Sequence, residues 1–158
     1  PGALNFTRKA AQKGITVFYL TNRDHSLEEP TRNNLRELGF PLQQIETSER
    51  PGDVILTNRE HDNWNSSKTQ RRKAIAENYR VIMLFGDNLN DFIDAEDKSV
   101  EERSALLKRY GKYFGRSWFM LPNPVYGSWE GSMMKPYEGT TDRDENIKNK
   151  IELLRPDY

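Results

Sequence analysis

The stretch that most constrains the fold is Val81–Asp91, where five apolar residues run into a glycine and two carboxylates follow. A continuous apolar run that ends at Gly86 is typical of a strand buried on both faces. In open α/β sheets, ligands bind beyond the carboxyl ends of the strands. Asp87 and Asp91 would lie there and suit a hard cation, most often Mg²⁺ where the substrate carries phosphate. A polar turn with Asp91 capping the next helix is the alternative interpretation.

The remainder of the chain alternates between strand-like and helix-like segments. Strands are predicted at Ile15–Thr21, Asp53–Thr57, Val81–Phe85 and Ser117–Leu121. Helices are predicted at Leu4–Lys13, Pro30–Leu38, Lys68–Asn78, Ser99–Tyr110 and Asp142–Leu154, with a loop over 122–131 and irregular structure over 132–141. This alternation predicts an α/β fold, a doubly wound and mostly parallel sheet with helices on both faces. At 158 residues, we expect residues 1–158 to form a single domain.

The composition narrows the classes of partner. The 24 basic and 24 acidic residues give a net charge of zero, so nothing global indicates nucleic acid or an anionic membrane. No apolar run approaches the roughly 20 residues of a membrane-spanning helix. Cysteine is absent, which excludes disulfides and thiol chemistry within this chain.

Three polar features stand at strand ends or helix starts, and a parallel sheet would gather them at one rim. Thr21 closes the first predicted strand, Lys68 opens the basic helix, and the acidic pair follows the third strand. A hydroxyl, an ammonium and metal-binding carboxylates together make a phosphate site. Fixed positive charge and a cation supply the electrostatic stabilisation that phosphoryl transfer requires.

Three longer strings carry a family resemblance: F-Y-L-T-N-R (18–23), L-F-G-D-N-L-N-D-F (84–92) and M-L-P-N-P-V-Y-G-S-W-E-G (120–131). They resemble the haloacid dehalogenase superfamily of phosphatases, and within it the class C acid phosphatases. These form the bacterial surface-lipoprotein branch that includes 5′-nucleotidases. The resemblance runs over nearly the whole chain.

The resemblance implies a role for each matching residue. Thr21 would bond the transferring phosphoryl group with help from Asn22, and Lys68 would contact the phosphate and the nucleophile. Asp87 would ligate Mg²⁺ directly or through water. Asp91 would hold the lysine or the water ligands of the metal.

The resemblance also implies the substrate and the location. Tyr126 would stack on the aromatic or nucleobase part of a small-molecule phosphomonoester, and stacking tolerates many rings. The family implies a protein on the bacterial cell surface, the outer membrane or the exterior, held to the membrane only through a lipid anchor outside this chain. The oligomeric state stays open, a dimer included.

One departure from the family concerns the nucleophile and the general acid, which lie in an Asp-x-Asp motif before the threonine strand. Residues 1–20 contain no aspartate, and the single such motif, Asp142–Asp144, is interpreted as a solvated helix start. We expect the upstream segment, with the first core strand and the lipid-attachment cysteine, to be missing from this chain. The chain alone is then expected to be inactive.

Other interpretations remain beside this one. A non-catalytic phosphate- or nucleotide-binding module would keep Thr21, Lys68 and Asp87 without a nucleophile. A receiver-like regulatory domain is disfavoured, because the acidic pair follows a late strand and a long loop comes after it.

Several candidates also have a plainer interpretation. Without the family strings, the basic helix around Lys68 is typical of a solvated face. Thr57 opens a second Thr-Asn-Arg string that echoes the first, and His25 and His61 are interpreted as surface residues.

Overall fold

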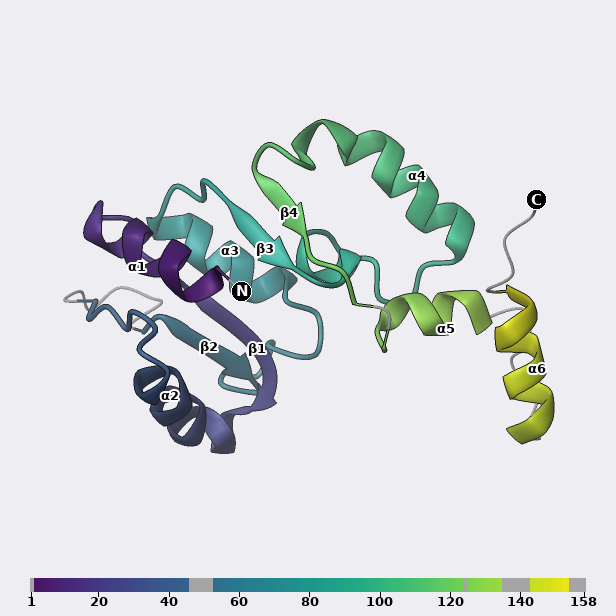
Figure 1. Cartoon of the computed structure of the whole chain (residues 1–158), viewed down its shortest axis with the longest axis horizontal. Helices are drawn as coiled ribbons and strands as arrows, with labels where there is room; N and C mark the ends of the chain where they lie inside the picture. The colour runs from purple at the N-terminus through teal and green to yellow at the C-terminus, as the bar shows by residue number, and fades with distance from the viewer. Residues whose placement is uncertain (1, 46–52, 124, 135–142, 154–158) are drawn as a thin grey trace. The chain divides into compact units, whose positions relative to one another are not determined.

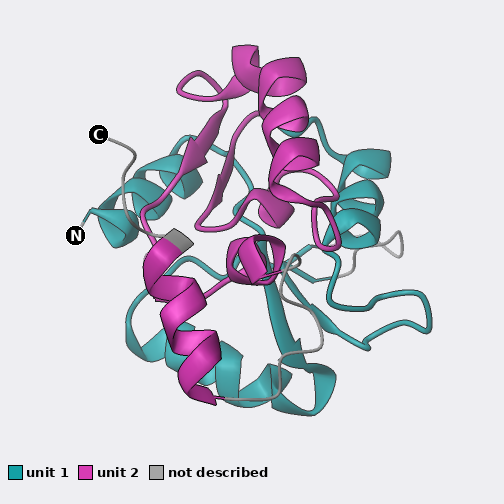
Figure 2. Ribbon diagram, turned by 90° about the vertical axis from the view of Figure 1, so that its right-hand side faces the viewer, with its two compact units in different colours: residues 1–81 teal, residues 82–158 magenta. Residues whose placement is uncertain are grey.

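A computed structural model of the chain describes residues 2–45, 53–123, 125–134 and 143–153 (Figure 1). It divides into two compact units, unit 1 over Pro1–Val81 and unit 2 over Ile82–Tyr158 (Figure 2). Each unit is described by itself below, and the expected single domain stays a prediction. None of the helices in the described ranges has the length and apolarity to cross a membrane.

Parallel strand pairs organise both units, which confirms the predicted α/β class with parallel strands. Unit 1 contains α1 (Ala3–Gln12), β1 (Tyr19–Asp24), the 3₁₀ helix η1 (His25–Leu27), α2 (Glu28–Glu37), β2 (Ile55–Asn58) and α3 (Thr69–Asn78). Unit 2 contains β3 (Leu84–Gly86), η2 (Leu89–Asp91), α4 (Val100–Tyr110), η3 (Gly111–Tyr113), β4 (Trp118–Met120), α5 (Ser128–Met134) and α6 (Arg143–Leu153). Strand β1 pairs with β2, and β3 pairs with β4.

The core of unit 1 lies around β2, whose first three residues are completely buried. On one face of the pair, Leu56 packs with Trp64 and with Ile75 of α3. On the other face, Tyr19 meets Phe40, just past α2, edge to face at 6.3 Å. Helices therefore cover both faces of this pair, as predicted for the sheet (Figure 1).

Strand β1 starts later than predicted, at Tyr19 rather than Ile15, and continues beyond Thr21 to Asp24. The Val17 N–H donates to Gln43 Oε1 at 2.8 Å, and Gln43 Nε2 donates to the Ile15 carbonyl at 2.9 Å. One glutamine side chain thus satisfies backbone groups that a neighbouring strand would otherwise pair.

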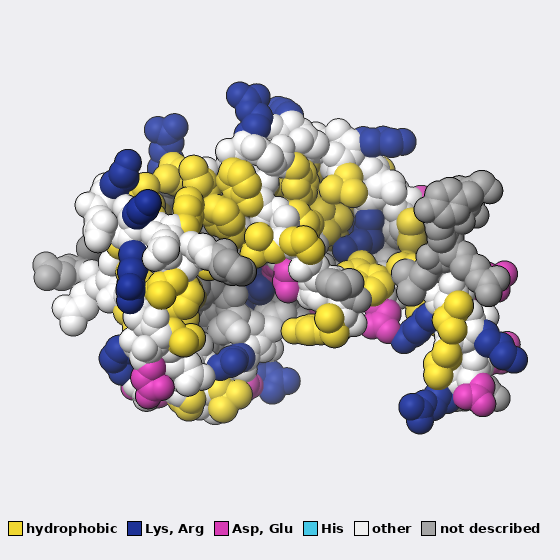
Figure 3. All heavy atoms as spheres, in the orientation of Figure 1, with side chains coloured by type: hydrophobic (Ala, Val, Ile, Leu, Met, Phe, Trp, Pro, Cys, Tyr) yellow, Lys and Arg dark blue, Asp and Glu magenta, His cyan; other side chains and the backbone are white. Residues whose placement is uncertain are grey.

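The prediction that Val81–Phe85 is a strand buried on both faces is wrong for the described structure. The strand covers only Leu84–Gly86, and the four large side chains at 81, 82, 83 and 85 are between 44% and 47% exposed. Within the described ranges β3 pairs only with β4, so its other edge has no strand partner. Hydrophobic side chains gather on the surface over β3 and β4 (Figure 3).

Helix α5 occupies Ser128–Met134, where the end of the predicted loop and the start of the predicted irregular segment were expected, whereas residues 122, 123 and 125–127 lie outside helices and strands as predicted. Residues 135–141 lie outside the described part. Trp129 and Met133, four residues apart on α5, line one cavity with Leu107 of α4. Tertiary packing of this apolar face selects the helix, although Gly131 lowers its intrinsic propensity.

Helix α4 begins where the sequence predicted, because Ser99 forms a capping box. The Glu102 N–H donates to Ser99 Oγ at 3.3 Å, and the Ser99 N–H donates to Glu102 Oε2 at 2.8 Å. The N-terminal donors of the helix are thereby satisfied.

Candidate functional site

In unit 1, a buried arginine holds the middle of β1. Arg71 of α3 is completely buried and donates from Nη1 to the Thr21 carbonyl. Its Nη2 donates to Asn22 Oδ1 at 2.7 Å and to the Asn65 carbonyl at 2.8 Å. The interpretation of this helix as a solvated basic face is therefore wrong at Arg71. The guanidinium instead ties the predicted phosphate-binding residues to the loop that precedes α3.

Lys68 is the N-cap of α3, one residue before the helix begins at Thr69. It precedes Arg71 by three residues, so the first turn of one helix carries both. Because Arg71 holds Thr21 and Asn22, the structure brings these predicted residues to the start of the helix that Lys68 opens.

The two Thr-Asn-Arg strings differ in how their threonines are used. Thr57 is completely buried, and its Oγ1 donates to Glu60 Oε2 at 3.2 Å. Thr21 is partly exposed, and its Oγ1 accepts the Arg23 N–H at 3.2 Å. Thr21 is therefore the threonine whose hydroxyl a ligand can reach.

A His–Glu cluster near the end of β2 was not predicted, since His25 was interpreted as a lone surface residue. Ligand atoms of His25, Glu28 and Glu60 lie within 4.8 Å of one another. His25 Nδ1 lies 3.1 Å from Glu28 Oε2, and Arg32 Nη2 donates to Glu28 Oε1 at 2.7 Å. No cation site is assigned here, because these donor atoms are already engaged with one another and with Arg32.

In unit 2, the acidic pair occupies the turn that follows β3. Asp87 is exposed, and its Oδ2 accepts from Asn123 Nδ2 at 2.9 Å. Asp91 Oδ2 accepts the backbone N–H groups of Asp87 and Asn88, both at 3.0 Å. Asn88 caps η2 and Asp91 completes its capping box, so Asp91 supports its own turn rather than capping the next helix. The predicted contacts of Asp91 with lysine or metal waters stay predictions.

Gly86 is required by the approach of Asp91 to the end of β3. A Cβ atom at Gly86 would lie 2.4 Å from both Cβ and Oδ2 of Asp91. No side chain fits at that distance, so the glycine that ends the apolar run lets the carboxylate reach the Asp87 and Asn88 amides.

Asn123 links the predicted metal ligand to the predicted substrate residue. Besides donating to Asp87, it accepts through Oδ1 from the Val125 N–H at 3.1 Å and the Tyr126 N–H at 3.5 Å. Tyr126 is 70% exposed, so its ring is open to a stacking partner. Asn123 was missed from the sequence, although it stands within the Pro-Asn-Pro-Val-Tyr-Gly string.

The residues present fit a hydrated divalent cation at Asp87. Mg²⁺ usually keeps several water ligands and binds through one or two carboxylates, alongside the phosphate oxygens. Asp87 offers such an exposed carboxylate, and the hydrogen bond from Asn123 Nδ2 to Asp87 Oδ2 orients it.

Comparison with known proteins identifies the family of the chain. Residues 1–129 match the family described as HAD superfamily, subfamily IIIB (acid phosphatase). Two similar solved structures are the class C acid phosphatase from Bacillus anthracis, with a TM-score of 0.79, and the same enzyme with tungstate bound, with a TM-score of 0.80.

Each of these structures is 29% identical to this chain, and the match covers 99% of this chain but 61% of theirs. The chain thus spans about three fifths of the length of these relatives. The family match and the structural likeness confirm the resemblance carried by the three strings. The chain belongs to the acid phosphatase subfamily IIIB of the haloacid dehalogenase superfamily.

Proposed function

We propose that this chain forms the phosphate- and metal-binding part of a Mg²⁺-dependent acid phosphatase. Its substrates are phosphomonoesters, with aryl phosphates and nucleoside 5′-monophosphates as the expected classes. One observation carries the proposal: in a chain of this family, the exposed Asp87 carboxylate directly follows β3 and is oriented by Asn123. Tungstate in the relative supports it further, because tungstate is an oxyanion comparable to phosphate.

In this proposal the residues of the chain bind and neutralise the phosphoryl group. Thr21 Oγ1 and the Asn22 side chain bond its oxygens, and Lys68 adds fixed positive charge. A Mg²⁺ ion held by Asp87 would neutralise charge that develops on the phosphoryl oxygens. The exposed Tyr126 ring stacks on the leaving group.

The attacking carboxylate is assigned to a segment outside these 158 residues. Residues 1–20 contain no aspartate, and Asp144 lies at the exposed start of α6. The aspartate of that other segment would form an aspartyl-phosphate, which water then hydrolyses. The chain alone should then bind phosphate without turning it over. By family resemblance, the whole protein is proposed to be lipid-anchored at the bacterial surface.

The test compares two variants of the protein that includes its upstream segment. Asp87→Asn should lower Mg²⁺-dependent hydrolysis of an aryl phosphate by about 100-fold or more, since metal stabilisation contributes several kcal/mol. Asp94→Asn, an exposed aspartate of the same connection, is the matched control and should retain activity. Equal activity of Asp87→Asn and wild type would contradict the proposal.

A non-catalytic phosphate-binding module is the second candidate, favoured by the absence of aspartate from residues 1–20. Calorimetric titration of the 158-residue chain with tungstate measures phosphate-like binding without turnover. Tungstate binding, combined with no hydrolysis by the longer protein from acidic to neutral pH, would favour the module over the enzyme.

A further inference from the structure

Arg103 of α4 is a buried charged side chain, and burying a charge costs free energy. It is only 8% exposed, and its burial lowers the pKa of the guanidinium. Among the residues that the structure describes, no carboxylate forms an ion pair with it. A buried cation without a counter-charge costs free energy unless hydrogen bonds compensate, and an apolar residue here would avoid that cost. The partners of Arg103 therefore indicate why an arginine is present.

Those partners belong to the connections that follow β3 and β4. Arg103 Nη1 donates to the Ala95 carbonyl at 2.6 Å and to Ser128 Oγ at 3.2 Å. Its Nη2 lies 3.5 Å from Asn88 Oδ1, which also accepts from Ser128 Oγ at 2.7 Å. Asn88 follows the end of β3 by two residues, and Ser128 begins α5. The guanidinium thus bridges the two connections and the segment that leads to α4.

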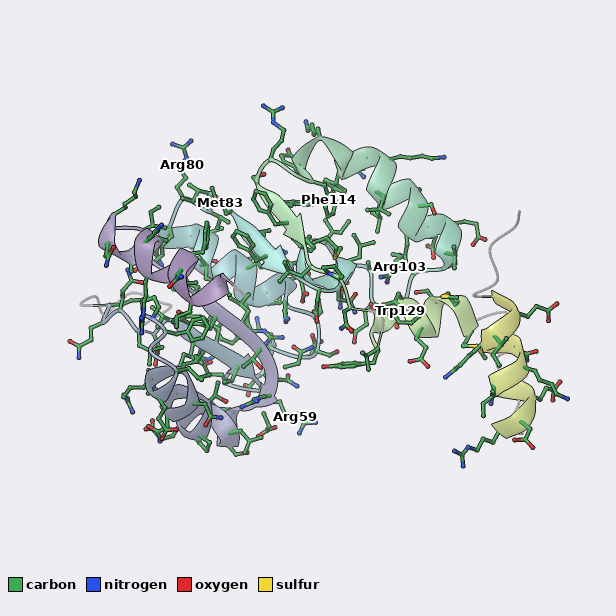
Figure 4. The ribbon with its side chains drawn as sticks, viewed as in Figure 1. Arg59, Arg80, Met83, Arg103, Phe114 and Trp129 are labelled. Atoms are coloured by element: carbon green, nitrogen blue, oxygen red, sulfur yellow. The ribbon has the colours of Figure 1, made fainter. Side chains whose placement is uncertain are left out.

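Gly127 gives independent evidence that the connection after β4 lies close to the connection after β3. A Cβ atom at Gly127 would lie 2.7 Å from Asn88 Nδ2 and 2.7 Å from Cδ1 of Trp129. Only a residue without a side chain fits between these groups. Asn88, Arg103, Gly127 and Ser128 are called the loop junction below. Arg103 and Trp129, labelled in Figure 4, line one cavity of about 310 Å³ together with Asp87.

The loop junction stands directly beside the two functional candidates of unit 2. Asn88 is adjacent to Asp87, and Gly127 is adjacent to Tyr126. Asn123, on the same connection as Gly127, donates to Asp87. A shift at the junction would therefore move the carboxylate against its asparagine partner.

We propose that Arg103 is a positioning residue, which fixes the connections after β3 and β4 against each other and thereby sets the affinity of Asp87 for a divalent cation. In this role it acts through Asn88 and Ser128, to which it donates hydrogen bonds. The cation part of this inference rests on the proposed function. The positional part rests only on the contacts of unit 2.

The test measures Mn²⁺ binding to the 158-residue chain by electron paramagnetic resonance, which needs no turnover. Arg103→Met should weaken Mn²⁺ binding by about tenfold, the usual effect of removing a residue that supports a metal ligand. Arg103→Lys should recover only part of this loss, because an ammonium lacks the planar fork that reaches several acceptors at once. Gly127→Ala should weaken binding in the same direction.

Two variants control for charge and for stability. Arg109→Met removes an exposed arginine from the same helix, where it lies 5.4 Å above the Tyr110 ring. Trp118→Leu disrupts the contacts of Trp118 with Tyr113 and Phe114 in unit 2, neither of which is a residue of the loop junction. Both should bind Mn²⁺ as the wild type does. A loss of affinity in Trp118→Leu equal to that in Arg103→Met would overturn the proposal, since it would reflect stability alone.

Hydrogen exchange separates this inference from the proposed function. The Asn90 N–H donates to Asn88 Oδ1 at 3.2 Å, so its exchange should accelerate in Arg103→Met relative to amides of β4. Wild-type Mn²⁺ affinity in Arg103→Met, or unchanged Asn90 exchange, contradicts the positioning role. If the wild-type chain binds no Mn²⁺, the proposed metal site fails, and Asn90 exchange alone then decides the positional part.

Discussion

Each unit has a buried arginine next to its own predicted site residues, and the two arginines bond different sets of partners. Arg71 in unit 1 donates to the backbone carbonyls of Thr21, Asn65 and Ser66 and to one side chain, that of Asn22. Arg103 in unit 2 reaches side chains, the Ser128 hydroxyl and the Asn88 amide, besides one carbonyl. Backbone carbonyls are present whatever the sequence, whereas side-chain partners can be lost by substitution. The geometry of unit 2 therefore depends on more residue identities than that of unit 1.

The largest effect is expected from removing the arginine of unit 1. Arg71→Met leaves the oxygen acceptors on Thr21, Asn22 and Asn65 without their charged donor and should lower the free energy of unfolding by about 4 kcal/mol. Lys73→Met, an exposed position of the same helix, is the matched control and should have little effect. Urea unfolding followed by circular dichroism measures both. Equal midpoints for the two variants would show that Arg71 is not the support described here.

The strands of the two units differ in burial, because β2 is enclosed and β3 is half exposed. Leu56→Ala should lower the free energy of unfolding by about 3 kcal/mol, since Leu56 packs with Trp64 and Ile75 in a closed core. Phe85→Ala should cost about 1.5 kcal/mol, because the side chain is already 47% exposed. The ordering of the two losses in urea unfolding is the result that matters. A larger loss for Phe85→Ala would mean that β3 is more enclosed than the structure shows.

The sequence predicted the order of the elements well, because hydrophobic runs, caps and glycines are local signals. The predicted start of α4 at Ser99 and the predicted end of α2 at Leu38 required no tertiary information, and the structure has both to within one residue. The sequence could not show that the apolar run of β2 is buried whereas that of β3 is half exposed. Burial depends on neighbours far along the chain, and β3 has a described partner on one side only.

The site residues were predicted from strand ends, helix starts and the family resemblance, whereas the residues that support them were missed. Arg71 and Arg103 both stand in charged helices, where local pattern favours exposure. Asn123 looks like an ordinary turn residue between two prolines. Each of these three residues supports the site by bonding a partner that lies far away in sequence. Asn123 and Asp87, for example, are 36 positions apart. No local pattern contains that information.

Asn88 provides a test of whether the geometry of unit 2 depends on the side chains that Arg103 bonds. Asn88→Ala removes the cap of η2 and the acceptor shared by Arg103 and Ser128, and should cost about 2 kcal/mol of unfolding free energy. It should also weaken Mn²⁺ binding, because Asp87 is its neighbour. Asn90→Ala is the comparison within the same turn, where the side-chain oxygen accepts the Ala95 N–H at 2.9 Å. Stronger Mn²⁺ binding by Asn88→Ala than by Asn90→Ala would contradict the account.

The last expected effect appears only at high pH and concerns the stability of unit 1. Burial raises the pKa of Tyr19 in unit 1 to about 12. Because this folded value exceeds that of an exposed tyrosine, about 10, the protonated hydroxyl stabilises the fold below pH 10 and this contribution is lost as pH rises from about 10 to 12. The unfolding free energy of the wild type should therefore decline over that interval relative to Tyr19→Phe, which has no titrating hydroxyl. Wild type and Tyr19→Phe should run parallel from pH 7 to 9, offset by the loss of the Tyr19 hydrogen bond to the Pro41 carbonyl. Parallel curves up to pH 12 would show that the ring is as hydrated in the folded chain as in the unfolded one, and the enclosure of unit 1 would then be weaker than its buried β2 indicates.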